Sequence, residues 1–530
     1  NGGGTLQVSS VASLNLPVTL NGAATFNVAG GADGLSLSGH VGGSGSLTKT
    51  GAGSLTLRGT ADYSGGTAVS GGSLVGSAAN LQGNITNNAI VYFGQDADGT
   101  YSGVMSGGGT LSKFGSATLT LTGLNTYQGL TQVTAGTLAV GRDENLGAST
   151  TDIRLFNGGT LRLLSSFDLA AGRDVELSTA GRLQLVNSTN TIAGAIHGSG
   201  TLAIEGAGIL TLAGTNTFIG AVSVTGSTLA ITADASLGDA SNGLSLDAAT
   251  LRFGSSFTLA GTRAITLGAG STIDTNGFDA TIASTISGSN GLTKNGAGKL
   301  SLTGTNTYSG DTVISGGGTL AIASDAALGN VTNGVTFDNG TLQFLASFDL
   351  ANTRALTLNA GGGTIDTNGN TTTITQAIGG VGGLTKAGAG TLTLSAANGY
   401  QGGTTLTGGL LAIAADTALG DANGGVSFNG GGLQALASVG IAGTRTVTLG
   451  AGGGTIDTNG YDVTIAQQIT GAGGLTKVGG GTLTLGNANT YGGGTTLTAG
   501  SLAVSGTGLG TGALTLNGGT LRFAGDITAA

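Results

Sequence analysis

Aspartate is the residue type whose positions in this chain could support acid and base catalysis. It recurs once per unit of about 90 residues, in the hexapeptide TIDTNG, as Asp274, Asp366 and Asp457. Paired acid and base work needs two carboxyl groups within about 5 to 9.5 Å of each other. If each unit of about 90 residues forms four stacked β-strand coils, as its shorter internal period indicates, equivalent aspartates of successive units are separated by about 19 Å. These carboxyl groups therefore cannot act together. Each aspartate is expected instead to close a turn with the Asn and Gly that follow it.

An arginine supplies a second recurring charge, and its positions are Arg173, Arg263, Arg354 and Arg445. Two interpretations stay open: a solvated arginine at the start of a strand, or a structural ion pair that fixes one turn per unit. The candidate pairs are Arg263 with Asp274, Arg354 with Asp366, and Arg445 with Asp457. An exposed pair of this kind contributes only about 0 to 1 kcal/mol. The lysine of the recurring tripeptide LTK is interpreted as a charge beside a corner of the chain. Neither cation suggests catalysis.

The two histidines, His40 and His197, precede repeat units in the segments GHVGGSG and IHGSG and are expected in loops. A metal site would need further ligands, which a chain with no Cys and few acids does not supply. A tandem array of the calcium-binding nonapeptide GGxGxDxUx is also missing, although GGGTIDTNG resembles one piece of it. The sequence therefore predicts no catalytic, cofactor-binding or metal-binding residue, no cofactor and no enzyme activity.

The stretch from Gly291 to Ala323, GLTKNGAGKLSLTGTNTYSGDTVISGGGTLAIA, is the unit around which the chain is organised, because six copies of it occur. Its apolar residues alternate within short runs, as strands do, and Gly, Asn, Asp and Ser separate the runs as turns. We expect Leu302, Ile314, Leu320 and Ile322 to point inward, as do Leu394, Leu406, Leu411 and Ile413 in another copy. We expect Thr303, Val313 and Ala321 to point outward.

A subperiod divides each unit into coils. Leu300, Leu320, Leu342, Ile365 and Leu392 follow one another at about 20 to 27 residues, the size of one three-stranded coil of a parallel β-helix. The predicted fold is all-β, a parallel β-helix with about four coils per 90-residue repeat. The expected segments of one continuous solenoid are 1–102 (irregular coils with one short repeat), 103–193, 194–283, 284–375 and 376–466 (repeats), and 467–530 (a truncated repeat).

Composition agrees with a β-solenoid and excludes several function classes. Among 530 residues there are 109 Gly and one Pro, and only 8% are charged, so long helices are not expected. The net charge of −9, without any basic cluster, gives no electrostatic basis for binding nucleic acid. No apolar run reaches the roughly 18 residues of a transmembrane helix. The absence of Cys suits the cytosol, and equally a chain that is exported unfolded through an oxidising compartment.

Both ends of the chain read as ordinary coil sequence, NGGGTLQV at the start and GGTLRFAGDITAA at the end. Uncapped solenoid ends expose unpaired backbone and apolar layers. We therefore expect either more β-helix beyond both ends, which we favour, or subunits that stack end to end. In the second case, Lys or Pro at Leu521 or Phe523 would suppress association.

The combined pattern LTKxGxGxLxLxGxNTYxGxTxVxxGxL resembles the passenger-associated transport repeat, or autotransporter-associated β-strand repeat, of Gram-negative autotransporters and related giant surface proteins. The copy around Glu205 departs from it, with Glu in place of Lys and Phe218 in place of Tyr. The resemblance implies a right-handed parallel β-helix that is exported through the outer membrane to the cell surface. It implies membrane contact only through a translocator barrel, and this chain contains no barrel sequence.

The leading functional hypothesis is a structural and adhesive passenger, a rigid stalk that supports export, adhesion or self-association. Its expected partners are another copy of the chain, a host or neighbouring cell surface, or glycans, reached through polar faces lined with Thr and Asn. One alternative is the subunit of an extracellular filament formed by end-to-end stacking. Another is a polysaccharide-degrading β-helix enzyme, which would need acids clustered on adjacent coils. Ice binding would need a Thr-x-Thr pair on every coil, and is more remote.

The coil size predicts the dimensions of the particle. At about 22 residues and about 4.8 Å per coil, 530 residues give about 24 coils and a length near 115 Å. Small-angle X-ray scattering of the isolated chain is expected to show a rod of this length, and a globular particle would contradict the prediction.

Overall fold

The computed structural model describes residues 3–505 and 507–523, so residues 1–2, 506 and 524–530 of the predicted end segments lie outside the described part. The fold is the predicted all-β one: 3% of the chain is helical, and parallel strands form a β-solenoid of about 25 turns. Two compact units share the chain. Unit 1 holds residues 1–255 and 262–264, and unit 2 holds 256–261 and 265–530. The repeat boundaries given above stay a prediction.

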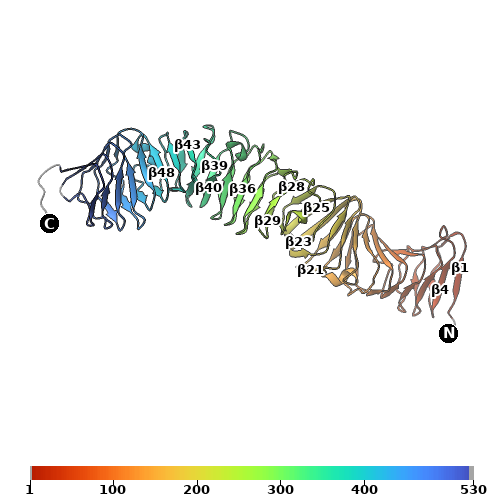
Figure 1. Cartoon of the computed structure of the whole chain (residues 1–530). Coiled ribbons are helices and arrows are strands. Elements are labelled where there is room, and N and C mark those ends of the chain that lie inside the picture. The colour runs from red at the N-terminus through yellow and green to blue at the C-terminus, as the bar shows by residue number, and fades with distance from the viewer. Residues whose placement is uncertain (1–2, 506, 524–530) are drawn as a thin grey trace. The chain divides into compact units, whose positions relative to one another are not determined.

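In each unit, short strands from successive coils lie side by side in parallel sheets (Figure 1). One ten-stranded sheet of unit 1 consists of β2 (Val11–Leu14), β5 (Gly34–Leu37), β8 (Ser54–Leu57), β10 (Ser73–Gly76), β12 (Ile90–Gly94), β15 (Thr110–Phe114), β17 (Thr131–Val133), β19 (Ile153–Leu155), β22 (Val175–Leu177) and β24 (Ile196–Gly198).

Unit 2 contains an eleven-stranded and an eight-stranded parallel sheet. The first consists of β30 (Phe257–Leu259), β33 (Ala280–Ile282), β36 (Lys299–Leu302), β38 (Thr319–Ile322), β40 (Gly340–Phe344), β42 (Gly363–Asp366), β45 (Leu384–Ala387), β47 (Thr404–Leu406), β49 (Val426–Phe428), β52 (Val447–Leu449) and β55 (Ile469–Gly471). The second consists of β43 (Thr371–Ile374), β46 (Thr391–Leu394), β48 (Leu410–Ile413), β50 (Gly432–Ala435), β53 (Gly454–Asp457), β56 (Leu475–Val478), β58 (Thr495–Leu497) and β60 (Leu514–Leu516).

Register places equivalent residues of successive coils on top of one another. Leu300 pairs with Leu320, Leu320 with Leu342, and Leu342 with Ile365, which confirms the first three predicted steps. The fourth step is wrong. Ile365 pairs with Lys386, whereas Leu392 pairs with Thr372, because β42 is followed in its sheet by β45 and β46 belongs to a different sheet, which begins with β43.

The predicted facing of the central unit is confirmed for its core. Leu302, Ile314, Leu320 and Ile322 are fully buried, and their equivalents Leu394, Leu406, Leu411 and Ile413 are at most 1% exposed. Thr303 is exposed and Val313 is half-buried, as expected for outward positions. Ala321 was expected outside but is 0% exposed. The 3-10 turn η3 (Asp325–Leu328) follows β38 after two intervening residues and packs against this strand, which accounts for the burial of this small side chain.

Replacement of Leu320 by Asp tests the layered core. The substitution would place an uncompensated charge between two apolar layers, and we expect it to lower the free energy of unfolding by several kcal/mol. Denaturant-induced unfolding followed by circular dichroism measures this loss. Thr303→Asp, at an exposed position of the same unit, is the control and should change the midpoint little. An unchanged midpoint in Leu320→Asp would contradict the assigned facing.

Candidate functional site

Each recurring arginine is buried in a clamp around a short 3-10 turn. Arg354 donates from Nε to Asp325 Oδ1 at 2.7 Å and from Nη2 to Asp325 Oδ2 at 3.0 Å, and Asp325 is the first residue of η3. The same guanidinium donates to the carbonyls of Leu328 and Asn333 at 3.3 and 3.1 Å. The arginine side chain is 0% exposed, although its aspartate partner is 21% exposed. The planar fork of five donors suits this two-oxygen contact and the carbonyls beside it.

Within residues 3–505 and 507–523 the clamp occurs four times, with turns η1 (Asp143–Leu146), η2 (Asp234–Leu237), η3 and η4 (Asp416–Leu419). The pairs and their Nε to Oδ1 distances are Arg173–Asp143 at 2.9 Å, Arg263–Asp234 at 2.9 Å, Arg354–Asp325 at 2.7 Å and Arg445–Asp416 at 2.8 Å.

Both interpretations of the arginine offered by the sequence need correction. The arginines are not solvated, since all four side chains are 0% exposed. An ion pair does fix one turn in each of these repeats, but the aspartate that pairs with the arginine is not Asp274, Asp366 or Asp457. Arg354 instead contacts an aspartate 29 residues earlier, on a turn of the preceding coil. Coil stacking brings that turn within reach, whereas the expected partner lies further along the chain.

The lysine of LTK is also buried, at the corner where it was predicted. Lys386 donates from Nζ to the carbonyls of Ala387, Gly388 and Gly408, at 2.8, 2.8 and 3.0 Å. Its register partners are the core residues Ile365 and Leu406, so the side chain occupies a position in an apolar stack. Five corner lysines share 0% exposure: Lys49, Lys113, Lys294, Lys386 and Lys477.

Burial is the main influence on the pKa of these lysines. It lowers the pKa of Lys113, Lys294 and Lys386 to about 8, because removal from water penalises the ammonium form. Nearby carboxylates oppose the shift; Asp274 does so for Lys294 and Asp366 for Lys386. The bonded carbonyls also favour the charged form, since they accept from the ammonium group.

Sequence reasoning missed a set of buried polar residues within the motif NTY. Asn306 accepts from the Ile286 backbone N–H at 2.8 Å and donates to the Ala327 carbonyl at 2.6 Å, so it connects three coils. Tyr308 is fully buried, with its hydroxyl 2.7 Å from Thr312 Oγ1. The repetition of NTY with the same spacing in several copies is the signal in the sequence that could have identified them.

The aspartates of TIDTNG serve turns, as predicted. Asp274 Oδ1 accepts from the Asn276 backbone N–H at 2.8 Å, and the bend continues through positive φ angles of 50° at Asn276 and 88° at Gly277. Asp366 and Asp457 accept in the same way from Asn368 and Asn459.

The two histidines differ in their settings. His40 lies in an exposed loop, as predicted, with Nε2 at 3.1 Å from Asp62 Oδ1. The prediction for His197 is wrong, because this residue lies within strand β24 and is half-buried. In residues 3–505 and 507–523 there is no group of three or more His, Cys, Asp or Glu side chains that could hold a metal ion. No helix in this same part of the chain is long and apolar enough to cross a membrane.

The surface of unit 2 carries a column of hydroxyl side chains. These residues occupy equivalent outward positions on eight neighbouring strands, from β38 to β55, and all are half-buried. The pairing of the strands places them in the order Thr319, Thr341, Thr364, Thr385, Thr405, Ser427, Thr448 and Thr470. We call this set the hydroxyl column.

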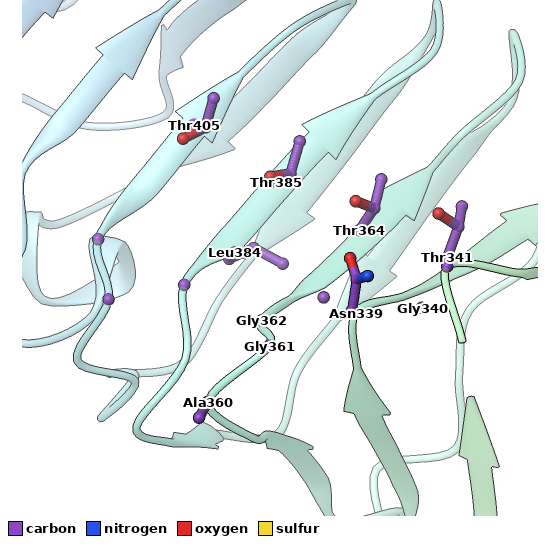
Figure 2. Close-up of a pocket in the computed structure, with 15 residues that line it drawn as sticks. Asn339, Gly340, Thr341, Ala360, Gly361, Gly362, Thr364, Leu384, Thr385 and Thr405 are labelled. Carbon is purple, nitrogen blue, oxygen red and sulfur yellow. The ribbon is translucent and has the colours of Figure 1, made fainter. Parts of the chain in front are cut away.

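A shallow groove of about 320 Å³ runs beside the hydroxyl column. Its floor is glycine-rich, formed by Gly361–Gly363 and by Gly402 and Gly403, with Asn339 on one side. Figure 2 shows Thr341, Thr364, Thr385 and Thr405 in a row on successive strands along it. An equivalent groove of about 260 Å³ lies along Thr455, Thr476 and Thr496 in the next repeat. Backbone groups and hydroxyls offer hydrogen bonds here, but no charged group suited to catalysis lines either groove.

Comparison with known proteins agrees with the repeat pattern. A model of the family described as Passenger-associated-transport-repeat matches six segments: 47–75, 111–140, 205–231, 292–322, 384–413 and 475–504. The chain is also similar to a curated protein of Brucella suis biovar 1 (strain 1330) named "Adhesin BmaC autotransporter". The two are 30% identical over 509 residues, which cover 85% of this chain and 14% of the relative. No solved structure matches the chain.

Removal of one clamp carboxylate tests the arginine clamps. In Asp325→Ala, Arg354 would stay buried without its counter-charge, and we expect a loss of about 3 to 5 kcal/mol in the free energy of unfolding. Urea denaturation measures the loss. Asp338→Ala, which removes an exposed aspartate of the same repeat, should cost far less. Equal costs for the two variants would contradict the buried-clamp interpretation.

The buried lysines predict a rise in stability on the alkaline side. The pKa of Lys113, Lys294 and Lys386 is about 8 in the folded chain, whereas the ordinary value is 10.5. Between these values the unfolded chain binds more protons, so the free energy of unfolding should increase with pH from about pH 8. Tyrosines reverse the trend above about pH 10, since burial raises the pKa of Tyr308 to about 12 and unfolding releases its proton.

Urea denaturation at a series of pH values measures the slope. Lys386→Met should reduce the rise, whereas Lys299→Met, at a half-buried strand position outside the corners, should leave most of it. A flat or falling free energy of unfolding between about pH 8 and about pH 10 would contradict the prediction.

Proposed function

Since the chain is an autotransporter passenger region built on passenger-associated transport repeats, we propose that it acts as a non-enzymatic, rigid adhesive stalk. It belongs to an exported protein on the cell surface of a Gram-negative bacterium. The chain spans 14% of the length of the curated adhesin that it matches, so the role proposed concerns this region and not the whole protein.

The observation that carries the proposal is the hydroxyl column with its glycine-floored grooves. Eight hydroxyl side chains follow one another at the strand spacing of about 4.8 Å, and they offer donors and acceptors in a regular row. Each contact that such a row makes is weak. A row of many contacts on one scaffold gains affinity through effective concentration, provided that the scaffold holds its geometry.

The buried clamps support the rigid part of the proposal. Arg354 joins its own coil to the 3-10 turn of the preceding one, and Lys386 joins carbonyls of two successive coils. Asn306 adds hydrogen bonds that connect three successive coils. Neighbouring coils therefore cannot slide past one another without breaking charge-assisted hydrogen bonds in a buried environment, and these are the stronger kind.

The partner that we favour is polar and extended: a second copy of the chain or a host or neighbouring cell surface. The test uses beads coated with the whole chain, and it scores their attachment to epithelial cells and to one another. The double variant Thr385→Lys and Thr405→Lys places long charged side chains along the hydroxyl column and should abolish most attachment. Thr303→Lys, at an exposed position outside the column, is the matched control and should attach normally. Normal attachment by the double variant would contradict the proposal.

A further inference from the structure

One pocket of unit 1 differs from the repeated grooves in its lining. It measures about 440 Å³ and lies at the carboxyl ends of four neighbouring strands, β8, β10, β12 and β15. This volume falls within the range of about 300 to 1,000 Å³ found for small-molecule sites. The pocket lies where the sequence leaves its regular period, because the corner lysines Lys49 and Lys113 are only about 64 residues apart instead of about 90.

An aromatic ring forms one wall of the pocket. Phe114 ends strand β15 and is 39% exposed, and it pairs in register with Gly94. A Cβ atom at Gly94 would lie only 2.5 Å from Phe114 Cζ, so the ring lies across the bare backbone of this glycine. Tyr92 supports the ring at its edge, with centroids 6.2 Å apart and planes at 73°. The glycine thus allows a fixed, partly exposed aromatic face.

Polar groups surround this face. Gln95 is only 2% exposed, lines the pocket, and has a buried Nε2 without a hydrogen-bond partner. A buried donor that is left unpaired costs about 1 to 3 kcal/mol, so a rotation of the Gln95 amide toward an acceptor in the pocket would recover that energy. Arg58 and Asp96 line the pocket from exposed positions. Asp98 also lines it, but one of its oxygens accepts from the Thr118 backbone N–H at 2.7 Å.

These residues depart from the repeat at their own positions. The residue after the corner lysine is Phe114 here, and the other copies have Thr50, Asn295, Ala387 and Val478. The residue after the strand of the LxL pattern is Arg58 here, and other copies have Thr122, Thr303, Ser395 and Gly486. A ring and a guanidinium therefore occur together at one site, in positions that the fold fills elsewhere with small, aliphatic or uncharged side chains.

We propose that this pocket binds a saccharide unit. A sugar presents an apolar C–H face that packs on an aromatic ring, and a rim of hydroxyls that both donate and accept. Phe114 fits the face, while Gln95 Nε2 and Arg58 fit acceptor oxygens and Asp96 fits hydroxyl donors. Two carboxylates against one guanidinium disfavour a phosphate or other anion, and the buried amide disfavours an apolar ligand. The proposal deepens the adhesive function and rests on it, because it names a ligand class for one site.

The chain contains no Trp, so Phe114→Trp introduces a single fluorescent reporter that keeps an aromatic face. Its emission is expected to change saturably with lactose, maltose or N,N′-diacetylchitobiose at millimolar concentrations. Saturation-transfer NMR on the unmodified chain should show transfer to the same sugar. Phe114→Ala should weaken that binding about ten-fold or more, since a lost aromatic contact of about 1.4 kcal/mol corresponds to that factor.

The matched control is Phe278→Ala, which removes a phenylalanine of similar exposure, 36%, from unit 2 and should leave sugar binding unchanged. Absence of saturable binding to all three sugars, or binding that survives Phe114→Ala, would overturn the proposal, as would pocket-dependent binding of a peptide instead of a sugar. Bead attachment separates this outcome from the adhesive function. If beads coated with the unmodified chain attach to cells while no sugar binds, the pocket proposal fails alone.

Discussion

The backbone carbonyls at the corners of the coils set the constraint on which this solenoid depends. Strand N–H and C=O groups pair with the next coil, but where the chain turns, carbonyls leave that ladder and would be buried without donors, which costs free energy. Side chains with several N–H donors satisfy them. Lys386 donates to three carbonyls from a single nitrogen, and Arg354 donates to further carbonyls while it contacts Asp325. The cations that looked like surface charges in the sequence are thus part of the interior.

One repeat carries no lysine at this position. The sequence placed Glu205 there, but the structure shows that the equivalent residue is Ile204, which is fully buried and pairs in register with Val224 as Lys294 pairs with Ile314. Glu205 is the next residue, and its carboxylate contacts Arg182 at 2.7 Å. Strand β25 (Thr201–Leu212) still bends, through φ angles of 93° at Gly206 and 149° at Gly208, so that its two halves pair with β26 (Val222–Thr225) and β27 (Thr228–Ile231). Isoleucine fills the same place in the apolar stack but offers no donor to the corner carbonyls.

The parts of the structure that are predictable from sequence are those that depend on local periodicity. Alternation over four residues fixes the facing of Leu320 and Ile322, and the TIDTNG turn closes between Asp274 and Asn276 within two residues. Contacts between coils are harder to predict from the sequence, because they depend on how the coils stack. Arg354 finds Asp325 through the packing of η3, and Ala321 is covered by that same turn. Ile365 pairs with Lys386 and not with Leu392 for a similar reason, because the stacking of the coils places β42 and β46 in different sheets. The period indicates that coils stack but not which side chains meet.

Repetition also limits what such a scaffold can recognise. A hydroxyl column built from equivalent positions presents nearly the same groups at each step, so it can bind extended polar partners in several registers and discriminate poorly among them. Selectivity needs a site whose groups differ from those of its neighbours. In this chain the change of period between Lys49 and Lys113 supplies one, because the altered coils place Phe114, Gln95 and Arg58 around a single pocket. The break in the repeat adds distinct chemistry without loss of the stacked core, since Leu74, Val91 and Leu111 continue the buried column through the same strands.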